Sequence, residues 1–334
     1  MTMETTRKLL ALGKLDGVGR TTLEKLAAQP DIADVAVEAL AEANPRIARA
    51  LTSADAWPAA LAAADADLGH AERTETRILS VLDADYPVLL RQTPDRPFFL
   101  YVRGQWAQPP SRSVAVIGTR TPTEHGRLVA ERITEYLVAD GWSIVSGLAL
   151  GCDRIAHEAA LRAGGHTVAV LAHGLQTVAP RQHAKLAEQI VEQGGALVTE
   201  YAYGVEPFPH QFVKRDRIQA GLAAGVIMIQ SDLEGGSLHA SRQALAYGRI
   251  LAVPHPTARD IANQEVKIQA NLVLCGNDAR ERAQLLHCDE QDLGRVFVIN
   301  GKADYEELAR RLEQVIGADV GGAEQQGSLF GGEG

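Results

Sequence analysis

The sequence predicts an α/β fold, with an extended Rossmann-like, doubly wound and mostly parallel sheet and a small helical N-terminal domain. From residue 113 onward, short apolar runs rich in β-branched residues alternate with amphipathic stretches, a pattern typical of strands buried on both faces of a parallel sheet. Each gap between two runs is long enough for a right-handed crossover helix. The expected domains are a helical domain over 1–70, a Rossmann-like domain over 75–285, a small strand–helix module over 290–318 and a disordered tail over 319–334.

Composition and charge narrow the class of protein. The chain has 334 residues, of which 46% are hydrophobic and 22% charged, and this is a globular profile. Its net charge of −9 means that a nucleic-acid partner would have to be attracted by a local basic patch. No apolar run approaches about 18 residues and the first residues lack a signal-peptide core, so we expect a cytoplasmic protein with no membrane contact. The three cysteines fall in no CxxC spacing and the histidines in no HExxH spacing, so neither a disulfide framework nor a metal site is expected.

The first 108 residues divide into two segments. Residues 1–70 are rich in alanine and leucine, and a helix breaks at Gly17–Arg20, within LLALGKLDGVGRTTLEKL, and then resumes. This resembles a helix–hairpin–helix or SAM-like element, whose hairpin N–H groups can hold a DNA phosphate; a glycine turn that joins two helices without a ligand is the alternative. Residues 70–108 are broken by proline and predict one or two strands packed on the edge of the main domain.

The regular alternation from residue 113 predicts the elements of the main domain. Strands are expected at 114–117, 143–145, 167–171, 196–199, 226–230 and 250–253. Helices are expected near 122–140, 153–163, 182–193, 214–223 and 236–247. The first helix has a start signal in Thr121 and Pro122 and a C-cap at Gly141.

Glycine-bearing loops follow the first, second and fifth strands of this domain. They contribute Gly118, Thr119 and Arg120, then Ser146 and Gly147, then Gly235, Gly236 and Ser237. Strand ends followed by helix N-termini bring unpaired N–H groups and positive dipole ends to one edge of a sheet, which favours phosphate. The spacing is not GxGxxG, so no dinucleotide site is expected. The alternative is that these glycines only turn the chain.

The most basic local cluster is the run HQFVKRDR at 210–217. Its candidate binding residues are Phe212, Lys214, Arg215 and Arg217. We expect the three cations to form one phosphate-binding patch with Arg120, and the phenylalanine to stack on a base. The alternative is a solvated helix start in which Asp216 bridges its arginine neighbours.

No catalytic constellation is expected. Asp153 and His157 are four residues apart, a spacing that permits an acid–base pair, although an aspartate that caps the helix and steadies the histidine is the simpler interpretation. Glu200 is the only isolated carboxylate expected at a strand end. We therefore expect a protein that is not an enzyme and has no cofactor.

Several motifs together resemble the DprA/Smf family of DNA-processing proteins. In chain order they are VAVIGTR, SGLALGCDRIAHEAAL, GGHTVAVLAHGL, LVTEY, FVKRDRIQAGLA, GGSLHASRQALAYGR and AVPHP, within about residues 75–280. The resemblance implies a Rossmann-like domain that forms a homodimer and binds single-stranded DNA in a basic pocket. It also implies a role in loading a RecA-type recombinase during transformation and recombination.

The family's functional residues carry over by motif. Arg120 matches the arginine of GSR, Ser146 and Gly147 match the SGLA loop, and Phe212, Arg215 and Arg217 match FPxRNR, with Lys214 at its variable position. The departures are Thr119 for serine, Val213 for proline, Asp216 for asparagine and His239 for the threonine of SGSLxTA. Asp216 adds a negative charge inside the expected DNA site. The winged-helix module that many members carry at the C-terminus is expected to be absent.

Two further hypotheses come from other motifs. The competing class is a nucleotide sensor or phosphoribohydrolase-like enzyme, because Glu234–Ser237 is similar in position to the PGGxGT turn of such enzymes, though it lacks the proline and the GT. Near the C-terminus, Gln326, Leu329 and Phe330 resemble the QxxLF peptide with which bacterial proteins bind the replicative sliding clamp.

Overall fold

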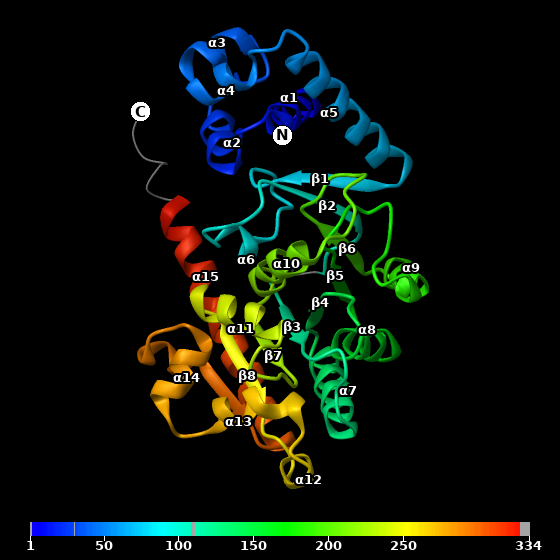
Figure 1. Cartoon of the computed structure of the whole chain (residues 1–334), viewed down its shortest axis with the longest axis vertical. Helices are drawn as coiled ribbons and strands as arrows, with labels where there is room; N and C mark the ends of the chain where they lie inside the picture. Colours follow the sequence, from blue (N-terminus) through cyan, green and yellow to red (C-terminus); the bar gives the residue numbers. More distant parts are fainter. Residues whose placement is uncertain (1, 30, 108–110, 328–334) are drawn as a thin grey trace.

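The computed structural model describes residues 2–29, 31–107 and 111–327, and within these residues one nine-stranded sheet forms the centre of the molecule (Figure 1). The strand order is β1-β2-β6-β5-β4-β3-β7-β8-β9. The strands are β1 (Thr76–Ser80), β2 (Phe99–Gly104), β3 (Ser113–Ile117), β4 (Ser143–Ser146), β5 (Thr167–Val170), β6 (Ala196–Thr199), β7 (Gly225–Met228), β8 (Ile250–Pro254) and β9 (Val296–Ile299). β1 pairs antiparallel with β2, and β2 pairs antiparallel with β6, so the prediction of added edge strands is confirmed. The other neighbouring strands run parallel, and the predicted doubly wound fold is confirmed.

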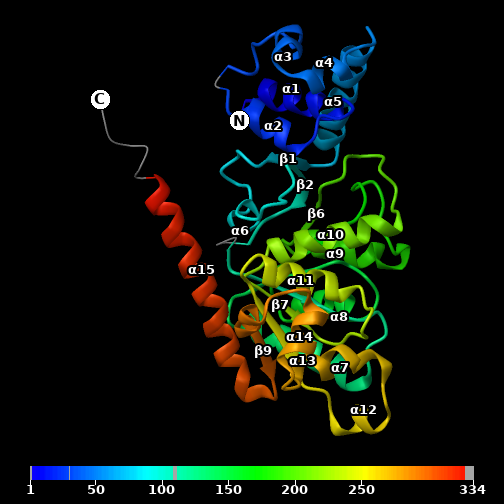
Figure 2. The same ribbon diagram turned by 60° about the vertical axis from the view of Figure 1, so that its left-hand side comes forward.

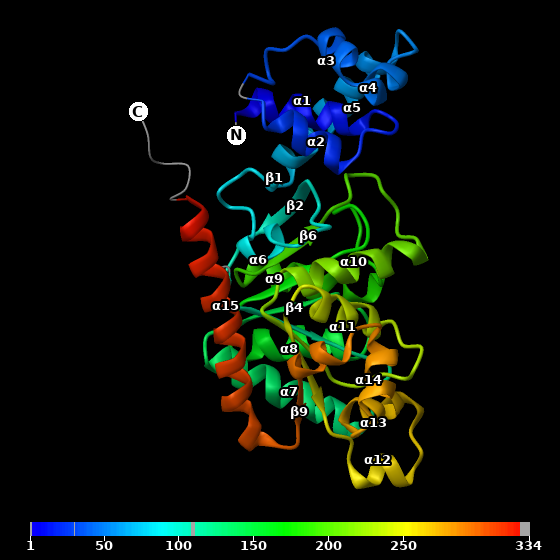
Figure 3. The same ribbon diagram turned by 90° about the vertical axis from the view of Figure 1, so that its left-hand side faces the viewer.

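Helices cover both faces of this sheet (Figure 3). One layer holds α7 (Glu124–Ala139), α8 (Cys152–Arg162), α9 (Ala184–Glu192) and α15 (Tyr305–Gly327). The other holds α10 (Pro209–Gly221), α11 (Ser237–Ala246), α13 (Gln269–Cys275) and α14 (Ala279–Leu286). Successive side chains of a strand point to opposite faces, so Val114 and Val116 of β3 pack in the core under α7 and α8 while Ala115 and Ile117 pack in the core under α10 and α11.

A helical domain precedes the sheet and lies beyond its β1–β2 edge (Figures 1 and 2). Its helices are α1 (Met3–Lys14), α2 (Arg20–Ala27), α3 (Val37–Ala43), α4 (Pro45–Ala50) and α5 (Ala56–Arg73). The chain turns between α1 and α2 at Gly17, where φ is +74°. An ion pair of 2.9 Å between Arg96 and Glu24, and stacked rings of His70 and Tyr203 with centroids 5.0 Å apart, join this domain to the sheet domain.

Two helix starts differ from the prediction. α7 begins at Glu124 because Thr123, rather than Thr121, is the N-cap, and its hydroxyl accepts the Gly126 N–H at 3.1 Å. α10 begins at Pro209, five residues before the predicted position. The side chain of Gln211 accepts the Phe208 N–H at 2.6 Å, and a proline in the first turn requires no N–H partner, so this start is stable without a hydroxyl cap.

The C-terminal segment adds to the same sheet. β9, expected within a separate module over 290–318, pairs in parallel with β8. α15 then runs to Gly327 along the outside of the body (Figure 2), so it includes the first residues of the segment that was expected to be disordered. Gln326 lies in this helix, whereas Leu329 and Phe330 are outside the described residues. Among the helices that the structure describes, none has both the length and the hydropathy that a membrane span needs.

The strand order creates a switch point beside β3. From β3 the chain proceeds outward through β4, β5 and β6, and it then returns through α10 to β7 on the other side of β3. Ligands of doubly wound sheets bind beyond the carboxyl ends of the strands at such a point. Gly151, at the start of α8, has φ +74°, and a Cβ there would lie 2.4 Å from the carbonyl oxygen of Thr119. Because Gly151 has no side chain, the β4–α8 loop can lie directly against the β3–α7 loop.

Replacing Gly151 tests this close approach. Gly164, at the other end of α8, has a similar φ of +71°, but a Cβ added there would have no atom within 4 Å, so it is a matched control. We expect Gly164→Ala to lower the free energy of unfolding by about 1 kcal/mol because of its backbone conformation alone. Gly151→Ala should cost about 1–3 kcal/mol more because of the added clash and because its ψ of −122° lies outside the left-handed region that alanine can adopt. Equal losses in urea unfolding would show that the two loops do not need this contact.

Candidate functional site

A pocket of about 710 Å³ opens at the switch point. The loops after β3, β4 and β7 and one face of α10 form its walls. The expected site residues that line it are Gly118, Thr119, Arg120, Phe212, Arg215, Gly235, Gly236 and Ser237. Ser146, Gly147, Lys214 and Arg217 are not among the residues that line it.

Arg120 is held at the mouth of this pocket by its backbone neighbours. The Thr119 N–H donates to the Gln230 carbonyl at 2.8 Å, and the Thr119 carbonyl accepts the Cys152 N–H at 3.1 Å. The loop is thus fixed between β7 and α8, while the Arg120 side chain is exposed and makes no ion pair with a described residue. A solvated and unpaired guanidinium on a loop of fixed backbone is well suited to bind a phosphate.

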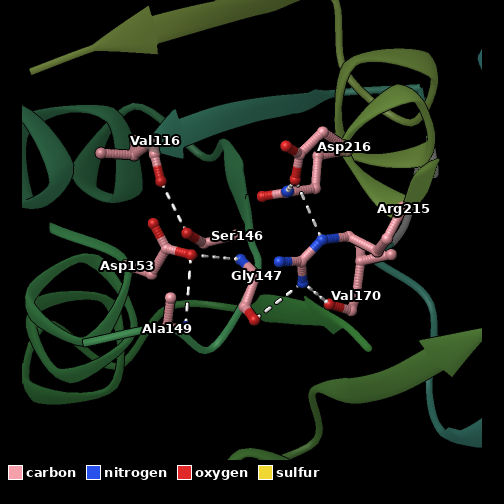
Figure 4. A network of polar contacts seen from close by, with 9 residues as sticks. Val116, Ser146, Gly147, Ala149, Asp153, Val170, Arg215 and Asp216 are labelled. Atoms are coloured by element: carbon pink, nitrogen blue, oxygen red, sulfur yellow. Dashed lines mark hydrogen bonds and ion pairs between the residues drawn. The ribbon is translucent and has the colours of Figure 1, made fainter. Parts of the chain in front are cut away.

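Arg215 is buried, which corrects its expected place in a surface patch. Figure 4 shows its guanidinium pointing toward Gly147, Val170 and Asp216. The residue is 4% exposed, its Nη1 donates to the Gly147 carbonyl at 2.8 Å and to the Val170 carbonyl, and its Nε lies 3.2 Å from Asp216 Oδ1. Successive residues of a helix differ by about 100° in direction, so a run of cations on α10 cannot point one way. Arg215 therefore binds protein carbonyls and holds the site together.

Lys214 and Arg217 both lie near the carboxylate of Glu200. Arg217 Nη2 lies 2.7 Å from Glu200 Oε2, and Lys214 Nζ lies 3.7 Å from the same oxygen and 5.7 Å from the centroid of the Tyr201 ring. Glu200, expected from the sequence as an isolated carboxylate, is thus the counterion of one lysine and one arginine. The structure therefore does not bring the four expected cations into one patch.

Asp153 and His157 form neither the acid–base pair that their spacing permits nor the simpler contact in which the aspartate steadies the histidine. Asp153 Oδ2 accepts the N–H groups of Gly147 at 3.1 Å and Ala149 at 3.3 Å, whereas His157 Nδ1 lies 2.7 Å from the Thr167 hydroxyl. Burial raises the pKa of Asp153 and lowers the pKa of His157 to about 3, so this histidine is neutral. Asp153 thus holds the loop after β4, whereas His157 joins α8 to β5.

Ser146 and Ser237 also have partners within the protein. The Ser146 hydroxyl is buried and donates to the Val116 carbonyl at 2.7 Å, and the Ser237 hydroxyl lies 2.9 Å from that of Ser231. Gly147 has no room for a side chain, because a Cβ there would lie 2.5 Å from the Arg215 guanidinium. Ser146 and Gly147 therefore pack against other parts of the protein and do not line the pocket.

Asp216, which is hydrogen-bonded to Gln219, gives the pocket an acidic wall. Asp216 Oδ1 accepts from Arg215 Nε and, at 2.8 Å, from Gln219 Nε2. Burial is the main reason that the pKa of Asp216 rises to about 6. Three other carboxylates line the pocket, and one of them, Asp232, is paired with Lys267 at 2.5 Å. Among the cations that line the pocket, Arg120 is therefore the one without a protein partner in the described part of the chain.

Exposed apolar side chains lie around the mouth of the pocket. Among them, only Val213 belongs to a run that the sequence analysis singled out, the run at 210–217. Leu150, Phe208, Val213, Leu233 and Val266 are between 36% and 63% exposed, and each lines the pocket or adjoins a residue that does. The Phe208 ring stacks with His210 at a centroid distance of 6.2 Å. Its position between two prolines was the available signal, because proline on both sides keeps this residue out of a helix interior.

The comparisons with known proteins agree with this architecture. The chain matches the family described as DNA recombination-mediator protein A over residues 77–284. Protein Smf of Escherichia coli (strain K12) is 42% identical over 172 residues, which cover 51% of this chain and 46% of that protein. DNA processing protein DprA of Streptococcus pneumoniae (strain R6) is 34% identical over 203 residues, which cover 60% of this chain and 71% of that protein. The chain thus matches about half the length of the E. coli relative.

Two solved structures share the fold. The X-ray structure of S. pneumoniae DprA has a TM-score of 0.60 at 24% identity and covers 80% of this chain and 96% of its own. The structure of DNA processing protein A from Helicobacter pylori, a study of its single-stranded DNA binding mode, has a TM-score of 0.55 at 25% identity and covers 72% of this chain and 96% of its own. Because the family match spans more than half of its length, the chain belongs to the DNA recombination-mediator protein A family of DprA and Smf proteins.

Proposed function

We propose that the protein binds single-stranded DNA at the switch-point pocket and acts as a recombination mediator. The observation that carries the proposal is the combination of an unpaired, exposed Arg120 with an apolar rim around a pocket of about 710 Å³. Proteins that bind single strands combine cations for the backbone with apolar or aromatic surfaces for unstacked bases. The H. pylori relative, whose single-strand binding mode has been studied, shares this fold.

The shape of the site favours a single strand over a duplex. The rim residues offer apolar surface, which in Phe208 is a flat ring, and only unpaired bases can turn their faces toward it. A pocket of this volume admits a nucleotide-sized group. The bases of an intact duplex are stacked inside the double helix and cannot enter.

Affinity should come less from charge than in most proteins that bind DNA. The chain has a net charge of −9, and Lys214, Arg215 and Arg217 all have protein counterions or carbonyl partners. Few phosphate charges are therefore neutralised on binding, and the dependence of affinity on salt should be shallow.

Two further roles, recombinase loading and dimer formation, are proposed because of the family resemblance. Loading of a RecA-type recombinase and formation of a homodimer are the roles that the DprA/Smf resemblance implies, and we propose both for this chain. At the α1–α2 turn, a second DNA contact and a glycine turn without a ligand both stay open. Binding of a sliding clamp through Gln326, Leu329 and Phe330 stays a prediction, since the latter two lie outside the described residues.

Arg120→Ala tests the phosphate contact. We expect it to weaken binding of a labelled (dT)15 oligonucleotide about five- to tenfold and to lower the slope of log affinity against log salt by about 1. The measurement is a fluorescence-anisotropy titration at several salt concentrations. Arg280→Ala is the control, since Arg280 is an exposed arginine on α14 that does not line the pocket. Equal affinity and equal slope in the two variants would reject Arg120 as the phosphate ligand.

Asp216→Asn tests the acidic wall. The pKa of Asp216 is about 6, so its charge is lost as the pH falls through 6, and a nearby phosphate is then repelled less. We expect the affinity of the native protein for (dT)15 to rise about threefold to tenfold between pH 7.5 and pH 5.5. The variant, which is uncharged at both pH values, should bind more tightly than the native protein at pH 7.5 and depend less on pH. Weaker binding by the variant at pH 7.5 would show instead that Asp216 is needed to hold Arg215 in place.

A further inference from the structure

We propose that Phe208, with the ring of His210 stacked against it, is a platform for one unpaired base just outside the pocket. This inference rests on the proposed function, because it names where the nucleotide next to the pocket would lie. It assigns the base contact at the mouth to a residue outside the run at 210–217, in which Phe212 was the residue expected to stack on a base.

The backbone of Phe208 is fixed where α10 begins. Its φ of −123° and ψ of 150° are extended, as expected for a residue that precedes a proline, here Pro209. Its N–H donates to Gln211 Oε1 at 2.6 Å, and its carbonyl accepts the Gln211 N–H at 3.0 Å. Gln211 is only 5% exposed, so the residue that holds this backbone is itself anchored in the protein. A base that stacks on the ring therefore has little backbone to order.

The ring of Phe208 is available to a ligand. Its centroid lies 6.2 Å from that of His210 and the two ring planes differ by 17°, within the range of offset stacking. Despite this contact, Phe208 is 54% exposed, and His210 is exposed as well. A nucleobase is a flat π system that can add to such a pair without a specific hydrogen bond.

Phe212 is less available than Phe208. It lies one turn further along α10, lines the pocket and is partly buried. The guanidinium carbon of Arg215 lies 5.9 Å from the centroid of its ring, and Arg215 is held by its carbonyl partners. The two phenylalanines therefore suit different nucleotides, Phe212 one within the pocket and Phe208 one outside it.

The surroundings of Phe208 indicate that the occupant is a base of the bound strand. Pro209, the next residue, lines the pocket, and so does Val213 one turn later. The unpaired Arg120 lines the same pocket. A strand that Arg120 holds by one phosphate has its adjoining nucleotides at the mouth, where an unstacked base needs apolar surface.

Substitutions of Phe208 in the full chain test the platform, with (dT)15 binding measured by fluorescence anisotropy at several salt concentrations. We expect Phe208→Ala to bind about five- to twentyfold more weakly. Its salt slope should not change, because a stacked base neutralises no phosphate. Phe208→Leu, which is apolar but has no flat ring, should lose nearly as much, whereas Phe208→Tyr should restore the affinity to within about twofold of the native value. The control is Leu82→Ala, because Leu82 is 50% exposed and does not line the pocket.

Removal of the bases tests the same contact from the side of the DNA. The second ligand is a strand of 15 abasic nucleotides, which keeps the phosphates and has no ring to stack. If a base lies on Phe208, the ratio of the (dT)15 affinity to the abasic-strand affinity should be about fivefold or more lower in Phe208→Ala than in the native protein.

The outcomes separate this inference from the proposed function. If the native protein binds no oligonucleotide, the proposed function fails. If Arg120→Ala weakens binding while Phe208→Ala and Phe208→Leu bind like the native protein, single-strand binding at the pocket stands and the platform is wrong. A loss in Phe208→Ala that is equally large for (dT)15 and the abasic strand would also overturn the platform, because the ring would then support the fold or a protein contact and not a base.

Discussion

The buried guanidinium of Arg215 is the interaction on which the site depends. It reaches from α10 to the carbonyl of Gly147 after β4, to that of Val170 in β5 and to the carboxylate of Asp216. A buried charge is tolerated only when it is paired and hydrogen-bonded, and this one has acceptors from three parts of the chain. Because the two carbonyls lie near the ends of adjacent strands, the contact fixes α10 against the carboxyl edge of the sheet, where it forms one wall of the pocket.

This arrangement decides which charges are available to a ligand. The cations of the run at 210–217 are used within the protein, by backbone carbonyls and by Glu200. Arg120, on the opposite loop, remains free among the described cations of the pocket. The site therefore depends on one exposed guanidinium, on apolar surface and on a few polar groups. It is not a strongly basic groove, which is consistent with the negative charge of the whole chain.

The sequence was sufficient to predict the fold and the edge of the sheet at which the candidate site lies. The strands of the main domain lie within two residues of their predicted bounds, because β-branched runs buried on both faces leave a pattern that is local in sequence. The same pattern placed Arg120, Phe212 and the Gly235–Ser237 turn at one edge of the sheet. The directions of the α10 side chains could not be predicted, because they depend on partners such as Glu200 and Val170 that only the tertiary structure brings near. A charged residue that matches a family motif can therefore have a structural role, as Arg215 does.

The most direct test of DNA binding at the pocket is photo-cross-linking. Oligonucleotides that carry 4-thiothymidine at single positions react at short range, and mass spectrometry of the digested protein identifies the linked peptides. If a single strand occupies the pocket, the linked peptides will contain residues 118–121, 208–219 or 231–240, which form its walls and rim. Cross-links confined to residues 9–27 would place the strand on the α1–α2 hairpin instead and would contradict binding at the switch point.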